Sequence, residues 1–317
     1  MKKKNCFVMT LLLLTLSFGL FGQGQALAAP EAGKKAILMV SFGTTFNDTR
    51  KVTIDAVTDK VKAAFPDYEV RQAYTSRIII KKLMDRDNRQ VDTEKQALEK
   101  LKEEGYSEVI VQTLHMEAGD EYDKVLKIVD SHVKAKSFER LTLGRPIFYF
   151  TGQEEKPDDY ALAINALKLQ LPKLTEKEAV AFMGHGGVHP SNTAYAALQL
   201  KMQDAGLKNV YVFTVDGYPT IENVIAKAKA NKVEKITLMP LMVVAGDHAN
   251  NDMAGDEPNS YKSQLIKAGF KVDAYLHGLG ENSGIQDIYV QHVKDAIENT
   301  YDKTKRGADR PAIPVVE

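Results

Sequence analysis

Two histidines follow apolar runs and stand among residue types that can do chemistry. His248 lies in GDHANND (246–252), directly after ITLMPLMVVA, and His185 lies between glycines in MGHGG, after EAVAF. Glycine allows the backbone to approach a ligand closely. An imidazole can accept a proton near neutral pH and can bind a first-row divalent metal. The two segments therefore predict a general base, a metal ligand, or both.

Two carboxylates stand in equivalent places after other apolar runs. Asp216 directly follows VYVFTV, in the segment TVDGYP, and Glu121 comes shortly after SEVIVQTLHM. An Asp-Gly pair is also a common turn former, so Asp216 has a structural alternative. His115 is expected either to line the same site or to be a half-buried structural histidine. The remaining polar neighbours of His248 are expected to be loop and capping groups: Asp247, Asn250 and Asn251.

These residues fall near the ends of strands in a chain whose predicted strands and helices alternate. Apolar runs predict strands, and apolar residues at helical spacing predict helices. Strands are predicted within 68–76 and 107–116, and strands that run into a turn or loop are predicted within 34–43, 178–187, 208–219 and 234–248. The predicted helices span 49–65, 92–104, 122–136, 191–205, 220–232 and 286–300. This alternation is typical of parallel sheets flanked by helices.

The order of elements repeats, and the two halves align on short motifs. TLHMEAGDEYD aligns with PLMVVAGDHANND, which matches Glu121 to His248. The sequence therefore predicts an α/β fold of two similar lobes, 29–150 and 151–317, with an active-site cleft between them. Ligands bind beyond the carboxyl ends of the strands in such sheets, and most of the candidate metal-binding and catalytic residues fall in the second lobe.

Residues 1–28 have the pattern of a secretory signal peptide: a basic start, one apolar stretch, and small residues before a cut after Ala28. An uncleaved membrane anchor is the alternative. Cleavage would remove the only cysteine, Cys6, and three of the 42 basic side chains, which leaves 39 against 42 acidic ones and a net charge of about −3. The mature chain would then have no thiol for catalysis or metal binding, and no basic excess for nucleic acid.

Common nucleotide and hydrolase signatures are missing from the sequence. It contains no GxxxxGK(S/T) motif and no GxGxxG after a strand. The GHGG segment lacks the serine that a nucleophile elbow needs. A P-loop enzyme and a serine hydrolase are therefore disfavoured.

Four motifs together resemble one enzyme family: ILMVSFGTT, MGHGG, TVDGYP and MPLMVVAGDHANNDMAGD. The chain resembles the anaerobic type of sirohydrochlorin cobaltochelatase, in the class II chelatase group that also holds the ferrochelatases, over nearly all of its length after residue 28. The resemblance implies two α/β lobes around a tetrapyrrole cleft. It also implies insertion of Co²⁺, or Fe²⁺, into sirohydrochlorin without ATP, in anaerobic cobalamin or related tetrapyrrole biosynthesis.

The resemblance also implies roles for particular residues. His185 and His248 match the family's pair of active-site histidines, which would accept the pyrrole protons and bind the metal. Asp216 would be a third metal ligand, although the family's motif usually has glutamate there. The residues expected to bind the substrate are Glu121, Thr44, Thr45, Arg77 and His115. No permanent cofactor is implied, because Co²⁺, Fe²⁺ or Ni²⁺ is a substrate.

The signal peptide predicts export to the periplasm, where tetrapyrrole synthesis is unusual. The alternative is therefore a periplasmic carrier that binds a metal ion or haem without turnover. Haem binding at a subunit contact and assembly into a homo-oligomer also stay open. We expect no nucleic-acid partner and no stable membrane span after cleavage.

Overall fold

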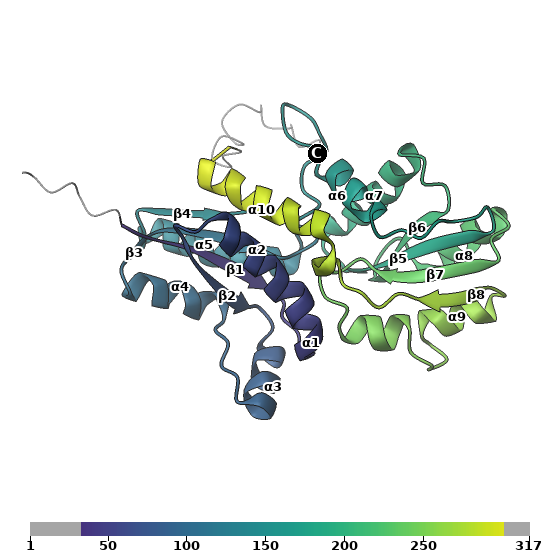
Figure 1. Ribbon diagram of the computed structural model, residues 1–317, viewed down its shortest axis with the longest axis horizontal. Helices are drawn as coiled ribbons and strands as arrows, with labels where there is room; N and C mark the ends of the chain where they lie inside the picture. The colour runs from purple at the N-terminus through teal and green to yellow at the C-terminus, as the bar shows by residue number, and fades with distance from the viewer. Residues whose placement is uncertain (1–32, 301–317) are drawn as a thin grey trace, which may run out of the picture. The chain divides into compact units, whose positions relative to one another are not determined.

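A computed structural model describes residues 33–300 of the protein, and Figure 1 shows two parallel sheets with their flanking helices. The first sheet has the order β2 (Glu69–Tyr74), β1 (Lys34–Ser41), β3 (Tyr106–Thr113), β4 (Arg140–Leu143). The second has the order β6 (Val210–Asp216), β5 (Glu178–Gly186), β7 (Lys235–Pro240), β8 (Lys271–Ala274). All neighbouring strands are parallel, and the second sheet repeats the topology of the first. The predicted fold class is confirmed.

Helices follow most of the strands. The first half contains α1 (Asn47–Arg50), η1 (Lys51–Asp55), α2 (Ala56–Ala64), α3 (Arg77–Asp87), α4 (Glu94–Glu103) and α5 (Asp120–Lys134). The second half contains α6 (Asp159–Lys168), η2 (Pro190–Asn192), α7 (Thr193–Asp204), α8 (Ile221–Ala230), η3 (His248–Met253), α9 (Tyr261–Lys267), η4 (Leu279–Glu281) and α10 (Ser283–Glu298). No helix within residues 33–300 combines the length and apolar character needed to cross a membrane. The predicted signal peptide lies outside the described residues.

The strands at the edges of the two sheets were not predicted. β4 and β8 are four residues long, and their side chains are half-buried or exposed, so neither has the apolar run of a central strand. Within the expected strand and loop at 234–248, β7 ends at Pro240, which has no N–H to extend the ladder. Residues 248–253 form a turn of π-helix, η3, where a loop was expected.

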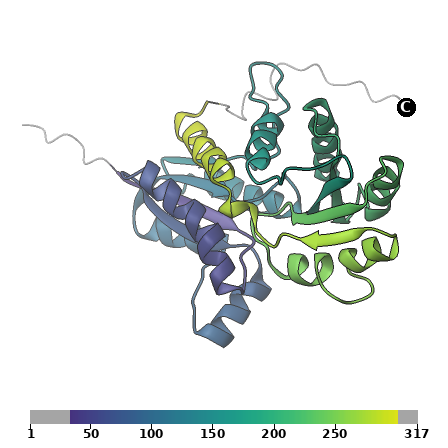
Figure 2. The same ribbon diagram turned by 45° about the vertical axis from the view of Figure 1, so that its right-hand side comes forward.

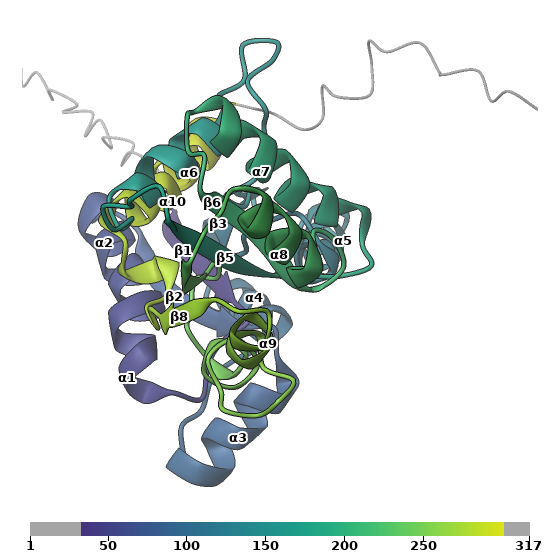
Figure 3. The ribbon, with the colours of Figure 1, turned by 90° about the vertical axis from the view of Figure 1, so that its right-hand side faces the viewer.

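α10, the last helix within residues 33–300, packs against elements of the first half of the chain. α10 contacts α2, α6 and β3; Figure 2 and Figure 3 show it, in yellow, beside the teal α6. Arg145 holds this arrangement through buried ion pairs with Asp159 in α6 (3.0 Å) and Asp295 in α10 (2.6 Å). The lobe boundary at residue 150 stays a prediction, and the structure adds that α10, from the second half of the chain, returns to the first sheet.

One buried apolar cluster draws on both sheets. It includes Ile37 and Met39 of β1, Val180 and Phe182 of β5, and Tyr289 of α10. Each fully buried side chain of this size contributes roughly 1.5–3 kcal/mol. The central strands are buried on both faces, which fixes the carboxyl ends of β1 and β5, where the candidate residues follow.

Candidate active site

The structure brings the two predicted histidines together. His185 is the penultimate residue of β5, and His248 is the first residue of η3. Their ring centroids lie 4.8 Å apart, and the ring planes are nearly perpendicular at 88°. Both side chains are at least partly exposed to solvent. The expectation that these two strand-end segments meet is therefore confirmed.

Each of these imidazoles has its Nδ1 atom held by an acceptor. His248 Nδ1 lies 2.6 Å from Asp252 Oδ2, and His185 Nδ1 lies 3.0 Å from the carbonyl oxygen of Gly186. Because a carboxylate and a carbonyl only accept, both Nδ1 atoms donate, and each neutral ring presents an unprotonated Nε2. Two Nε2 lone pairs are thus available to bind a metal ion or to take protons.

The π-helical turn explains why Asp252 holds His248. The turn brings the carboxylate four residues after the imidazole onto the same side of the helix. Two amides brace it: Asn250 Nδ2 donates to Gly246 O at 2.7 Å, and Asn251 Nδ2 donates to Asp247 Oδ1 at 2.9 Å. The side chains of Asn250 and Asn251 therefore make hydrogen bonds within and just before this turn, Asp247 makes no side-chain cap bond, and Asp252 orients the ring.

Glycine and asparagine fix the loop that carries His185. Gly186 has φ +73°, and a Cβ there would lie 1.9 Å from the carbonyl oxygen of Asp216. Asn192 joins the same two loops. Its Oδ1 accepts from the backbone N–H of Gly187 at 3.2 Å, and its Nδ2 donates to the carbonyl oxygen of Tyr218 at 2.7 Å. Only glycine fits this close approach, so the residue type at 186 is set by the contact between the loops.

Asp216 lies beside the histidine loop but is not part of a ready-made metal site. It is the last residue of β6, its backbone pairs with Gly186, and its side chain is exposed. Within residues 33–300 no three His, Cys, Asp or Glu side chains form a group that could hold a metal ion. Metal binding by Asp216 stays a prediction.

Glu121 and His115 interact with each other in the first lobe. Burial opposes ionisation of Glu121, but the hydrogen bond from Lys124 and the influence of the Thr75 hydroxyl bring its pKa below the usual value. Burial lowers the pKa of His115 to about 4, although Glu121 acts in the opposite sense. Both ring nitrogens of His115 are shielded and have no hydrogen-bond partner within residues 33–300. His115 is therefore neutral at neutral pH, and substrate binding by either residue stays a prediction.

The other expected substrate-binding residues follow β1 and β2. Thr44 is buried, and a Cβ on Gly246 would lie 3.9 Å from its Oγ1, so the loop after β1 approaches the loop that leads to His248. Thr45 accepts a bond from Arg86 through its carbonyl oxygen at 2.6 Å. Arg77 is largely exposed and lies 3.8 Å from Glu94. Their contacts with a substrate stay predictions.

Glu117 is a carboxylate that the sequence analysis did not single out. Burial raises its pKa, while a hydrogen bond from Tyr195 and the charge of His185 act in the opposite sense. It is thus a first-lobe acid within electrostatic reach of His185. The signal in the sequence that could have identified Glu117 was its position after an apolar strand, two residues beyond His115.

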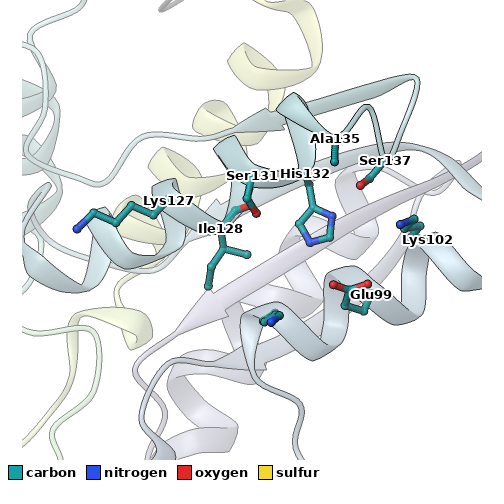
Figure 4. A pocket seen from close by; sticks show the side chains of 9 residues that line it. Glu99, Lys102, Lys127, Ile128, Ser131, His132, Ala135 and Ser137 are labelled. Atoms are coloured by element: carbon teal, nitrogen blue, oxygen red, sulfur yellow. The ribbon is translucent and has the colours of Figure 1, made fainter.

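A separate pocket of about 390 Å³ lies between α4 and α5 (Figure 4). His132 points toward Glu99 there, and burial lowers the pKa of this histidine. The pocket is lined by Lys95, Glu99, Lys102, Lys127, Ile128, Ser131, His132, Ala135 and Ser137. None of the expected site residues lines it, and His132 is structural, as its buried position against Phe138 indicates.

Comparison with known proteins identifies the family. Residues 35–298 match the family described as cobalt chelatase (CbiK), so the chain belongs to the cobalt chelatase family. The sirohydrochlorin cobaltochelatase of Salmonella typhimurium is 41% identical over 264 residues, which cover 83% of this chain and 97% of the relative. The sirohydrochlorin cobaltochelatase CbiKC of Nitratidesulfovibrio vulgaris is 32% identical over 265 residues, or 83% of this chain and 91% of the relative. The resemblance read from the motifs is confirmed.

Solved structures show the same fold. SirB from Bacillus subtilis with Fe³⁺ superposes with a TM-score of 0.57 at 15% identity, covering 84% of this chain and 97% of that one. The sirohydrochlorin chelatase SirB from Bacillus subtilis subspecies spizizenii, in complex with cobalt, gives a TM-score of 0.55 at 15% identity, covering 84% and 96%. At this identity the likeness concerns the fold alone.

Proposed function

We propose that this protein is a sirohydrochlorin cobaltochelatase, which inserts Co²⁺ into sirohydrochlorin without ATP. Membership of the cobalt chelatase family and the 41% identical relative support this function over a carrier. The observation that carries the mechanism is the pair of Nε2 lone pairs that His185 and His248 present beside each other.

Metal insertion requires two proton acceptors. The free macrocycle carries two pyrrole N–H groups, and both protons must leave as the metal enters. His185 and His248 each have one unprotonated nitrogen, which is the form that general-base catalysis needs. The carboxylate of Asp252 stabilises positive charge on His248 after it takes a proton. Each histidine can therefore remove one proton.

The same nitrogens can deliver the metal. Imidazole and carboxylate ligands suit divalent cobalt, iron and nickel, and a site with few ligands leaves coordination positions for the macrocycle. Asp216 follows the strand next to His185 and supplies negative charge to offset that of the incoming cation. The metal is thus a substrate that passes through this site.

The loops around the site offer surface for a flat, carboxylate-rich macrocycle. Exposed apolar side chains follow β1, β5 and β6: Phe42, Phe46, Val188 and Tyr218. The three aromatic rings among them can pack against a planar molecule. The exposed guanidinium of Arg77 can meet a carboxylate of sirohydrochlorin, as can the hydroxyl of Thr45.

An anaerobic absorbance assay separates a chelatase from a carrier. Protein from Ala29 onward is mixed with a large excess of sirohydrochlorin and Co²⁺, beside a mixture without protein. A chelatase converts many equivalents of the free macrocycle to the metallated product. A spectral change that stops at one equivalent, or a rate equal to that without protein, would identify a carrier and overturn the proposed function.

We propose further that the protein acts outside the cytoplasm, because residues 1–28 have the pattern of a cleaved signal peptide. Fractionation of expressing cells should recover a chain that begins at Ala29 in the periplasm. Recovery of the full-length chain in the membrane or the cytoplasm would overturn this proposal. The recovered protein also tests two further expectations, haem by its absorbance spectrum and a homo-oligomer by light scattering.

A further inference from the structure

A hydrogen bond joins a loop of the first lobe to the helix behind His185. Glu117 follows β3, and its backbone pairs with Phe148. Tyr195 lies in the first turn of α7 and is only 1% exposed. Tyr195 Oη donates to Glu117 Oε2 at 2.8 Å. The bond connects parts of the chain that are 78 residues apart.

The ring of Tyr195 lies directly against the backbone that carries His185. A Cβ on Gly184 would lie 2.2 Å from Tyr195 Cε1, so the phenol ring occupies the space beside this strand. Burial raises the pKa of Tyr195 well above its usual value, and the backbone N–H groups of Gly186 and His185 act on its oxygen in the opposite sense. The hydroxyl therefore lies between the Glu117 carboxylate and the peptide groups at His185.

A second set of contacts holds the same two segments together. A Cβ on Gly119 would lie 3.1 Å from Ser191 Oγ, so the first-lobe loop passes close to the start of α7. His189 Nε2 lies 3.5 Å from Asp123 Oδ2, and its Nδ1 accepts from the backbone N–H of Ser191 at 3.1 Å. The segment after β3 is thus fastened to the segment after β5 at more than one point.

The carboxylate of Glu117 costs folding free energy at this place, so its presence calls for a function. A half-buried carboxylate costs free energy that an apolar side chain would not. Burial raises its pKa accordingly, and the bond from Tyr195 partly offsets this effect. The charge of Glu117 interacts electrostatically with Tyr160, Tyr195 and Tyr289, and with the imidazoles of His185 and His189.

We propose that Glu117 is a positioning residue for His185, acting through the hydroxyl of Tyr195. The proposal rests on the chelatase function, in which His185 Nε2 must face the bound macrocycle. The hydrogen bond holds the ring of Tyr195, which lies against Gly184, and thereby positions the strand end that carries His185. A displacement of about 1 Å at a reacting group can cost on the order of 100-fold in rate. Glu117 itself does not touch the substrate.

The kinetic test compares Tyr195→Phe, Glu117→Ala and Glu117→Gln. The first two variants remove the bond, so kcat for Co²⁺ insertion should fall roughly 10- to 100-fold with little change in KM for sirohydrochlorin. Glu117→Gln keeps an acceptor oxygen and should keep most of the rate. The double variant Tyr195→Phe with Glu117→Ala should be no slower than either single variant, because both remove one interaction.

The matched control is Tyr211→Phe. Tyr211 is also a buried tyrosine, 2% exposed, and its hydroxyl accepts a hydrogen bond from Asn231 at 3.0 Å. This control removes a buried tyrosine hydroxyl from β6 without touching the His185 loop, and its kcat should equal that of the wild type. Equal losses in Tyr211→Phe and Tyr195→Phe would attribute the effect to general stability and overturn the proposal.

Hydrogen exchange tests the positioning without activity. Exchange of amides in a peptide containing residues 184–187 should be faster in Tyr195→Phe and Glu117→Ala, and unchanged in Glu117→Gln and Tyr211→Phe. Unchanged exchange in the first two variants, or additive losses of kcat in the double variant, would overturn the positioning role. If the wild type fails to turn over, the proposed function fails, and the exchange result still decides whether Glu117 holds this loop.

Discussion

The imidazole rings of His185 and His248 lie at right angles with their centroids 4.8 Å apart, although the residues come from different strands of the second sheet. Acceptors hold both Nδ1 atoms, so the two Nε2 atoms are the ones left to react. Two bases beside each other match a reaction that releases two protons. This relationship is the basis of the predictions that follow.

Asp252→Ala should slow the enzyme without unfolding it. The carboxylate orients His248 and favours its unprotonated Nε2, and removing such a partner typically costs 10- to 100-fold in activity or metal affinity. The measurement is kcat for Co²⁺ insertion. The control is Glu281→Ala. Glu281 Oε2 lies 2.7 Å from Nδ1 of His277, also four residues away, so this variant removes an equivalent histidine–carboxylate contact outside the site. A normal rate in Asp252→Ala would show that His248 needs no orienting partner.

Asp216→Glu should retain activity, whereas Asp216→Ala should raise KM for Co²⁺. The longer acid keeps the charge beside the His185 loop, and the family's motif usually has glutamate at this position. Steady-state kinetics at varied Co²⁺ checks both variants. A large loss in Asp216→Glu would mean that the shorter side chain is matched to this site, and unchanged KM in Asp216→Ala would remove the residue from metal binding.

Gly186→Ala should destabilise the protein more than Gly187→Ala. Both glycines have positive φ, +73° and +151°, which costs a residue with a Cβ on the order of 1–3 kcal/mol. At Gly186 the Cβ would also collide with the carbonyl of Asp216, while at Gly187 no atom of residues 33–300 lies within 4 Å. Urea denaturation of the two variants measures the difference. Equal losses would show that the backbone moves to accept the methyl group.

The sequence predicted the elements that carry the site better than the contacts within it. Long apolar runs located β1, β3, β5 and β6, because a strand buried on both faces needs such a run. The glycines around His185 and the polar run after His248 marked the two segments that carry the paired histidines. The short edge strands β4 and β8 carry no comparable pattern and were missed.

The partners of the histidines depend on geometry that the sequence does not encode locally. Asp252 orients His248 only because residues 248–253 form a π-helical turn. The spacing of apolar residues in this segment did not predict that turn. Glu117 reaches Tyr195 across 78 residues, and that contact arises from the packing of the two halves. Asn192 stands at the N-cap position of α7, yet its side chain bridges the loops of His185 and Asp216 and makes no cap bond.

His115→Gln should make stability less dependent on pH. The pKa of His115 is lowered to about 4 in the folded protein, against about 6.5 in an unfolded chain, so only the unfolded state gains its proton between these values. Stability should therefore fall as pH drops from about 6.5 to about 4, by up to roughly 3 kcal/mol from this residue. Urea denaturation across this range should give a shallower decline in His115→Gln. His132 and His292 act in the same sense and keep part of the slope; an unchanged slope would mean that His115 is protonated in the fold.

The most direct test is the initial rate of Co²⁺ insertion by His185→Ala, His248→Ala and the double variant, with His277→Ala as the control outside the site. Folding of each variant is checked by circular dichroism. Both single variants should lose turnover, the double variant should be no worse, and His277→Ala should match the wild type. Wild-type rates in both His185→Ala and His248→Ala would contradict it and place the chemistry elsewhere in the molecule.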